Sequence, residues 1–579
     1  MPARSKSSSL AYPKLAIPGI VFLLGLLLTL WMQSLISDGA LFSSDAGLKA
    51  ILTQQIAAQI RSGSFPLNVA LTVRDSTADW VVQVWNSGLY PVAPPFAYEA
   101  NGQAFSTFPF LFSLLTAPFY ALFGEVGLHI IPVLAMWAIW IRFWQIGLRA
   151  AWDAASISLG LFALIFASPL SLYSSTYSEH TLAVALAFWG VSALLYPRKK
   201  VLLLRHLPGV RLISSGVLVG LSVWFRPEML GIAIALSFIV CLGWLLPKWR
   251  LITPLSAADV FLFLGSLICT VSIFLAVNYA IYGHVFGLYG LLIANRFDAI
   301  APFQQIKDSY SGLLLGFWRY FPIALLVGVA ALCSPEFKRA SLKTTNRFKG
   351  FKTPNVEKIG IVSLIQNEPL AGRTLMLVGV LLALAAPWLW AIPTGRQWGL
   401  GIYLGLVPFL SVVLAEQLKV GFFQNWARRI MLVGTAVALA FGIHMNTLNG
   451  AFSLYQDPQT QSTSLLTNYV SMRSIVSELK TTSTPWIAVE RQSVAHRLWA
   501  ALPSKTFFYT RDADALEQLA IALTEQNESE FLFLCESAQR CSVAENGFEG
   551  LSLDSGSQLT ATLQGQFGRY PLYAITISQ

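Results

Sequence analysis

Long apolar runs, separated by short polar segments, fill most of residues 1–450. A helix of about 20 apolar residues is long enough to cross the hydrocarbon core of a bilayer. The pattern therefore predicts an α-helical polytopic membrane protein. Its eleven expected membrane-spanning helices lie at residues 15–36, 126–148, 154–173, 180–196, 212–227, 228–247, 258–282, 311–333, 373–392, 398–416 and 429–448.

One further apolar run, Phe108–Phe123, decides the topology. It is short for a membrane span and contains Pro109 and Pro118. If it crossed the membrane, the basic loops at 197–211 and 335–373 would lie outside, against the preference of Lys and Arg for the cytoplasmic side. We therefore expect it to lie at the membrane interface, with the N-terminus cytoplasmic and the loop at 37–125 external.

After residue 450 the pattern changes to short strand-like and helical runs. We expect a transmembrane domain at 1–450 and a small soluble extracytoplasmic α/β domain at 451–579. The latter contains Cys535 and Cys541, which an oxidising compartment would allow to pair, and the sequence leaves open whether they are bridged. Its predicted elements are strands at Trp486–Glu490, Thr506–Thr510, Phe531–Cys535 and Tyr570–Ile577 and a helix at Ala513–Gln526.

The composition agrees with a membrane location. Hydrophobic residues make up 55% of the chain and charged residues 12%, whereas soluble proteins carry about 25% charged residues. The net charge of +10 comes from basic loops between apolar runs, without a basic stripe on a soluble face, so we expect no nucleic-acid partner. The simplest setting is the inner (plasma) membrane of a bacterium, with membrane lipids around the apolar helices.

Charged residues near the membrane gather at the predicted external ends of the helices. Because ionisable groups are costly close to lipid, they are candidate functional residues. Each also has a structural alternative: Asp45 as N-cap of a helix at 46–60, Glu179 and His180 as a solvated turn, Arg226 and Glu228 as an ion pair, and Arg396 as an ordinary loop residue. Their common face nevertheless predicts one site, made of Asp45, Glu179, His180, Arg226, Glu228 and Arg396.

The order of these features resembles the GT-C superfamily of membrane glycosyltransferases, which includes protein O-mannosyltransferases and aminoarabinose transferases. The resemblance covers about residues 10–450. The motifs that carry it are Asp45 in the first external loop, the aromatic and proline-rich stretch 90–96, the interfacial helix ending at Gly124, the Glu179-His180 turn and the stretch Trp224–Glu228.

The resemblance implies that the protein transfers a sugar from a polyprenyl-phosphate donor to a hydroxyl of a glycan, lipid or protein acceptor at the external face. Asp45 would be the general base, removing the proton of that hydroxyl. Glu179, His180 and Glu228 would bind substrate. The donor phosphate would be bound by cations, with Arg226 and Arg396 as first candidates and Arg296 or Lys307 as further ones.

The chain departs from the family pattern at one position. Many relatives carry two adjacent acidic residues in the first loop, whereas Ser43 and Ser44 precede a single Asp45 here. One carboxylate is a small ligand set for a hard cation. We therefore predict no tightly held metal and no cofactor besides the lipid-linked donor, while a loosely bound divalent ion stays open.

Two other functions use a polytopic membrane protein. A transporter or flippase usually has related halves and ionisable residues at the midplane of the membrane. No matching halves are visible in this sequence, and Arg142 and Arg319 lie toward the ends of their predicted helices. An O-antigen ligase or polymerase usually has its main external loop late in the chain, whereas the long membrane-associated loop comes first here. The glycosyltransferase is therefore the favoured interpretation.

Overall fold

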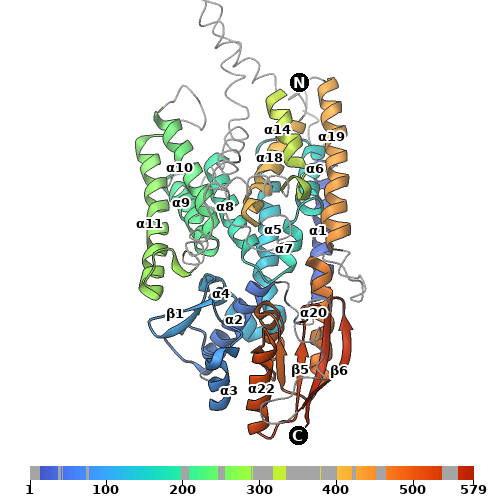
Figure 1. Ribbon diagram of the computed structural model, residues 1–579. Coiled ribbons are helices and arrows are strands. Elements are labelled where there is room, and N and C mark those ends of the chain that lie inside the picture. Colours follow the sequence, from blue (N-terminus) through green and yellow to red (C-terminus); the bar gives the residue numbers. More distant parts are fainter. Residues whose placement is uncertain are drawn as a thin grey trace, which may run out of the picture.

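Figure 1 shows the computed structural model of the chain. Long helices lie side by side in its upper part. The blue elements of the first loop and the orange and red C-terminal elements together lie below them. The structure describes residues 13–36, 39, 41, 43–73, 77–196, 208–245, 255–288, 290, 317–333, 379, 401–419, 425–451, 465–537, 541 and 558–578.

The upper part consists of apolar helices whose outward-facing side chains, such as Leu23, Phe261 and Val433, are largely exposed. Within the part of the chain that the structure describes, five stretches are long and apolar enough to cross a membrane: Ala16–Ser34, Glu125–Arg149, Pro227–Leu245, Ala257–Tyr282 and Trp426–Gly450. Exposed apolar faces of this extent are stable only in lipid, so this is a membrane protein. The helices are α1 (Pro13–Ile36), α5 (Glu125–Arg149), α6 (Ala154–Phe166), α7 (Leu170–Ser175), α8 (His180–Leu195), α9 (Pro208–Phe225), α10 (Leu230–Leu245), α11 (Ala257–Tyr282), α14 (Ile323–Cys333), α18 (Val407–Leu418) and α19 (Asn425–Ile443).

Helices occupy, in whole or in part, ten of the eleven predicted spans, and the span at 373–392 lies outside the described residues except for Gly379. The predicted span at 154–173 is two helices, because α6 ends at Phe166 and α7 starts after Pro169. Its first part has 13 residues and is about 20 Å long, less than the thickness of the hydrocarbon core. The number of membrane crossings therefore stays a prediction.

The run that decides the topology forms helix α4 (Phe110–Phe123). Its 14 residues extend about 21 Å, which is short for a membrane crossing and agrees with an interfacial position. Arg61 donates hydrogen bonds to the Tyr120 and Ala121 carbonyls at the end of α4. Gly124 follows with a φ of 60° and turns the chain into α5.

The first loop also contributes helices and strands below the apolar helices (Figure 1). Helix α2 (Ser44–Ser62) packs along α4, and α3 (Asp79–Val84) follows it. Strands β1 (Ala97–Ala100) and β2 (Gln103–Ser106) form an antiparallel hairpin that pairs Ala97 with Ser106.

The C-terminal segment, residues 465–578, contains a five-stranded sheet in the order β4-β3-β5-β7-β6. Strand β3 pairs in parallel with β4 and β5, while β7 pairs antiparallel with β5 and β6. The predicted strands and helix lie within one residue of those observed at each end, whereas β6, α20 and α21 are additional. The elements are α20 (Leu465–Thr481), β3 (Trp486–Val489), α21 (Gln492–Trp499), β4 (Thr506–Tyr509), α22 (Ala513–Glu525), β5 (Glu530–Leu534), β6 (Gln558–Phe567) and β7 (Tyr570–Ser578).

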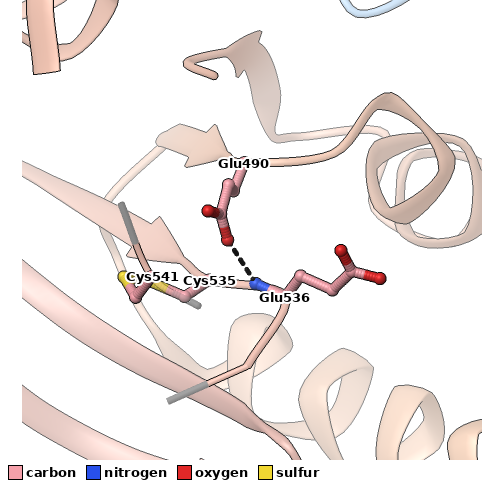
Figure 2. The surroundings of a disulfide bond; sticks show 4 residues. All are labelled: Glu490, Cys535, Glu536 and Cys541. Atoms are coloured by element: carbon pink, nitrogen blue, oxygen red, sulfur yellow. Dashed lines mark hydrogen bonds between the residues drawn. A yellow bond between two sulfur atoms is a disulfide. The ribbon is translucent and has the colours of Figure 1, made fainter. Parts of the chain in front are cut away.

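A disulfide joins Cys535, which follows β5, to Cys541 (Figure 2). Their Cα atoms are 5.4 Å apart, and both side chains are buried. Beside the bridge, the Glu536 backbone N–H donates a hydrogen bond of 2.8 Å to the Glu490 carboxylate. The sequence left open whether these two cysteines are bridged, and the structure shows the bridge. It forms a small covalent loop directly after the central strand β5.

The first loop and the C-terminal segment pack directly on each other. The Trp85 indole N–H donates a 3.0 Å hydrogen bond to the Phe507 carbonyl in β4, and the rings of Trp80 and Trp486 meet edge to face at 4.9 Å. Segments more than 400 residues apart in the sequence thus form one layer below the apolar helices.

Candidate active site

The first turn of α2 carries Asp45. Ser43 is the N-cap of this helix, and its hydroxyl accepts a hydrogen bond of 3.3 Å from the Ala46 N–H. The alternative that Asp45 itself is the N-cap is therefore wrong. Because Asp45 and Lys49 lie one turn apart, the Lys49 ammonium reaches the Asp45 carboxylate at 3.2 Å.

Lys49 connects the first loop to the segment before α8. Its ammonium also forms an ion pair of 2.5 Å with Glu179 and lies 4.9 Å from the centre of the Phe108 ring. Glu179 and His180 are 1% and 4% exposed, so the alternative of a solvated turn is wrong.

Arg226 extends these ion pairs to the break between α9 and α10. Its guanidinium lies 2.9 Å from Glu179 and forms a second ion pair with Glu228. Pro227 starts a short 3-10 turn there, while Arg226 keeps an extended backbone. The ion pair that the sequence offered as an alternative is thus present, and Arg226 belongs to a larger charged cluster.

The ion-pair cluster comprises Asp45, Lys49, Glu179, Arg226 and Glu228. Its members come from three separate parts of the chain, and four of them are almost fully buried. Burying charges is costly unless each has a close partner of opposite sign. The alternation of acidic and basic groups along the cluster supplies these partners, so the cluster holds the three segments in a defined geometry.

A group of hydroxyls supports the cluster from the side of α4. The Tyr177 hydroxyl lies 2.6 Å from Thr53 Oγ1 in α2 and 2.8 Å from Thr116 Oγ1 in α4. The Ser113 hydroxyl donates a hydrogen bond to the Lys49 carbonyl at 3.0 Å. Burial raises the pKa of Tyr177 to about 12, so its phenol stays protonated and these hydrogen bonds persist at neutral pH.

The other predicted site residues divide into two groups. His180 Nδ1 lies 2.5 Å from the Ser178 hydroxyl, and its ring lies 4.8 Å from that of Tyr173. Its Nε2 is buried and has no hydrogen-bond partner within the described residues. Arg396, Arg296 and Lys307 lie outside the described residues.

The member of the ion-pair cluster to which the sequence assigned no role is Lys49. Its spacing of four residues from Asp45 on a predicted helix was a usable signal, since such pairs face each other. Its contact with Glu179, 130 residues further along the chain, could not be found from local spacing.

Nearby cations keep two of the cluster's carboxylates, Asp45 and Glu179, ionised despite their burial. Burial by itself raises the pKa of Asp45, but Lys49, with smaller help from Ser43 and Arg226, brings that pKa below its ordinary value. Burial also acts against ionisation of Glu179, and Lys49 and Arg226 together hold the pKa of Glu179 far below its ordinary value. Both groups are therefore carboxylates at neutral pH, and Asp45 differs from Glu179 in its access to solvent.

The fold and the site define a helical membrane protein with a buried ion-pair cluster at one end of its apolar helices. No protein-family model and no curated protein matches the chain.

The chain is similar to solved structures of membrane transferases. ArnT from Cupriavidus metallidurans in the apo state has 12% identity and a TM-score of 0.46, over 95% of this chain and 97% of that chain. The undecaprenyl phosphate complex of ArnT has a TM-score of 0.43, at the same identity and coverage. The oligosaccharyltransferase AglB from Archaeoglobus fulgidus, with an inhibitory peptide and a dolichol-phosphate, has 12% identity and a TM-score of 0.40, over 88% of this chain and 69% of that chain.

ArnT and AglB are GT-C glycosyltransferases, the superfamily that the sequence motifs resemble. At these TM-scores the similarities are weak, so we infer function from the residues of the site.

Proposed function

We propose that this protein is a membrane glycosyltransferase that moves a sugar from a polyprenyl-phosphate donor to an acceptor hydroxyl. The exposure of the three clustered carboxylates is the observation that supports it. The side chain of Asp45 is 27% exposed, whereas those of Glu179 and Glu228 are 1% and 4% exposed. Asp45 is the carboxylate of the cluster that an external hydroxyl can reach, which suits it to the role of general base.

In the proposed reaction, Asp45 accepts the proton of the acceptor hydroxyl while the acceptor oxygen bonds to the anomeric carbon. The bond between that carbon and the donor phosphate breaks, and the polyprenyl phosphate leaves with the electron pair. Attack opposite the leaving group inverts the anomeric configuration. Lys49 holds one carboxylate oxygen of Asp45 at 3.2 Å and so fixes the direction from which the base approaches.

The charge of the cluster limits what it can bind. Its three carboxylates and two cations sum to one negative charge, which does not attract a phosphate. Positive charge from beyond these five side chains is needed to bind the donor. Arg396 therefore remains our first candidate for the donor phosphate, with Arg296 or Lys307 as further ones. Arg226, engaged with two carboxylates, would reach the phosphate only by changing a partner.

We propose that His180 binds a hydroxyl group of the substrate, either on the sugar or on the acceptor. A buried ring nitrogen without a hydrogen-bond partner costs about 1–3 kcal/mol, which a substrate hydroxyl would recover on binding. Glu228, which pairs with Arg226, stays in our proposal as a substrate-binding residue. This arrangement belongs at the extracytoplasmic face, in our proposal that of a bacterial inner membrane.

The pH dependence of transfer tests the pairing of Asp45 with Lys49. The base must be deprotonated, and its pKa is below the ordinary value of about 4, so we expect kcat/KM to stay constant down to about pH 4. In Lys49→Met the cation that lowers the pKa of Asp45 is gone, so burial should raise this pKa. The pH below which kcat/KM falls should therefore increase by about 1–3 units. The measurement is the pH profile of purified protein in lipid nanodiscs.

Arg61→Met is the matched control for this experiment, because Arg61 is an exposed cation in the last turn of the same helix. Its profile should overlay that of the wild type. If Lys49→Met raised the donor KM and left the acid limb in place, Lys49 would be a donor-binding residue and would not set the pKa of the base.

Direct assay separates the transferase from its rivals. Purified protein should convert a polyprenyl-phosphate sugar and a hydroxyl acceptor into glycosylated acceptor and free polyprenyl phosphate. Movement of the lipid-linked sugar across proteoliposomes without conversion would favour a flippase. The lipid-linked glycans of cells with and without the gene would identify the sugar that is moved.

A further inference from the structure

The first turn of α2, which carries Asp45, lies directly against helix α21 of the C-terminal segment. A Cβ atom added to Gly47 would come within 2.0 Å of the His496 carbonyl oxygen, so the two backbones approach as closely as only glycine allows. Further along α2, the Gln54 amide donates a 2.5 Å hydrogen bond to the Ala500 carbonyl. The two helices are therefore in contact over about two turns of α2.

The His496 side chain lies at the centre of this contact and is fully buried. Its Nε2 is 2.8 Å from the Pro91 carbonyl, and its Nδ1 is 2.7 Å from the Ser44 hydroxyl. A carbonyl oxygen only accepts hydrogen bonds, so Nε2 carries the proton. In the neutral ring, Nδ1 is then an acceptor, and the Ser44 hydroxyl donates to it.

Two observations support a neutral His496. Burial, reinforced by the neighbouring Arg497, lowers the pKa of His496 to about 4, although the Pro91 carbonyl acts in the opposite direction. The Phe96 ring and the imidazole lie nearly perpendicular, with their centres 4.8 Å apart, and this apolar contact favours the uncharged form.

Ser44 is free for this bond because Ser43 is the N-cap of α2. Ser44 directly precedes Asp45, so a constraint on Ser44 is a constraint on the backbone that carries the Asp45 carboxylate. The aromatic contacts of Trp80 and Trp85 with the sheet also hold the first loop on the C-terminal segment, but from helix α3 and the turn after it.

We propose that His496 is a positioning residue of the transferase site: through Ser44 it holds the first turn of α2, and so fixes the Asp45 carboxylate relative to the acceptor. The inference rests on the proposed function for its effect on catalysis. It makes the C-terminal segment part of the site, with His496 acting through Ser44 and not on the reacting atoms themselves.

Two substitutions at His496 separate its two hydrogen bonds. His496→Asn keeps an oxygen acceptor close to the position of Nδ1, and His496→Gln keeps an N–H donor close to that of Nε2. We expect His496→Gln and Ser44→Ala each to lower kcat about ten- to a hundredfold with little change in donor KM, as displaced catalytic groups do. His496→Asn should retain a rate within about threefold of wild type, because Ser44 keeps its partner.

The double variant Ser44→Ala/His496→Gln tests whether the two residues act through one bond. Its kcat should be no lower than that of the poorer single variant, since contacting residues that share one interaction are not additive. Multiplied losses, or a loss in His496→Asn equal to that in His496→Gln, would overturn the proposal. In either case His496 would act through packing and not through Ser44.

Hydrogen exchange measured on the full-length protein in nanodiscs gives a readout that needs no activity. Ser44→Ala and His496→Gln should speed amide exchange at residues 44–50, while His496→Asn should not. Arg491→Ala is the control. Arg491 directly precedes α21, and its side chain is 58% exposed. Unchanged exchange at 44–50 in all variants would overturn the positioning role. Faster exchange together with no transfer by the wild type would leave that role standing and overturn the proposed function.

Discussion

Replacing Asp45 with Asn is expected to lower the rate of sugar transfer by about 10²–10⁴-fold, the usual loss when a general base is removed. Asn has the shape of Asp but cannot take up the proton of the acceptor hydroxyl. Lys49 keeps its ion pair of 2.5 Å with Glu179 in this variant, so folding and membrane insertion should be preserved. The measurement is single-turnover transfer by purified protein, alongside its yield and elution profile.

Asp79→Asn is the control for the Asp45 variant. Asp79 is an exposed carboxylate in the first turn of α3, in the same loop but outside the ion-pair cluster. Its transfer rate should equal that of the wild type. Turnover by Asp45→Asn within about tenfold of the wild type would remove Asp45 from the role of base.

The second large effect is expected on stability, for Glu179→Gln. This carboxylate lies between Lys49 and Arg226, and its removal leaves two buried cations with one partner fewer. Breaking a buried ion pair from one side typically costs about 3–5 kcal/mol of unfolding free energy. We expect a clearly lower midpoint of thermal unfolding in detergent, together with lower yield.

Glu228→Gln should lower the free energy of unfolding by less, because Arg226 retains Glu179 at 2.9 Å.

The pH dependence of stability follows from the lowered pKa of Glu179. Its contribution to stability is complete above the unfolded-state pKa of about 4.3 and is lost only as the pH falls toward the lower folded-state pKa. The wild type and Glu179→Gln should therefore differ in stability at pH 7 and converge in strong acid. Equal unfolding midpoints at pH 7 would show that the cluster does not stabilise the fold.

The helices and four of the five cluster residues were predictable from the sequence, because both leave local patterns. Apolar runs of helical length predicted the long helices, and short β-rich runs predicted β3, β4, β5 and β7. The cost of charges near lipid identified Asp45, Glu179, Arg226 and Glu228, which the structure brings together.

What the sequence could not supply depends on contacts between distant segments. The partner of Lys49 is Glu179, and the partner of Ser44 is His496, 452 residues away. Strand β6 was missed although Leu559, Ala561 and Leu563 alternate with polar residues, the pattern typical of a strand with one covered face. The break of the predicted helix at 154–173 shows in turn that a continuous apolar run need not be one helix when Pro169 interrupts it.

The glycine contact between α2 and α21 has a consequence for protein engineering. Grafting another protein's C-terminal module onto these apolar helices would bring a foreign surface against Gly47, where there is no room for even one extra methyl group. A workable chimera would have to transplant the first loop and the C-terminal module together, as a matched pair. The boundaries at which such a chimera can be joined are therefore set by packing contacts and not by the order of segments along the chain.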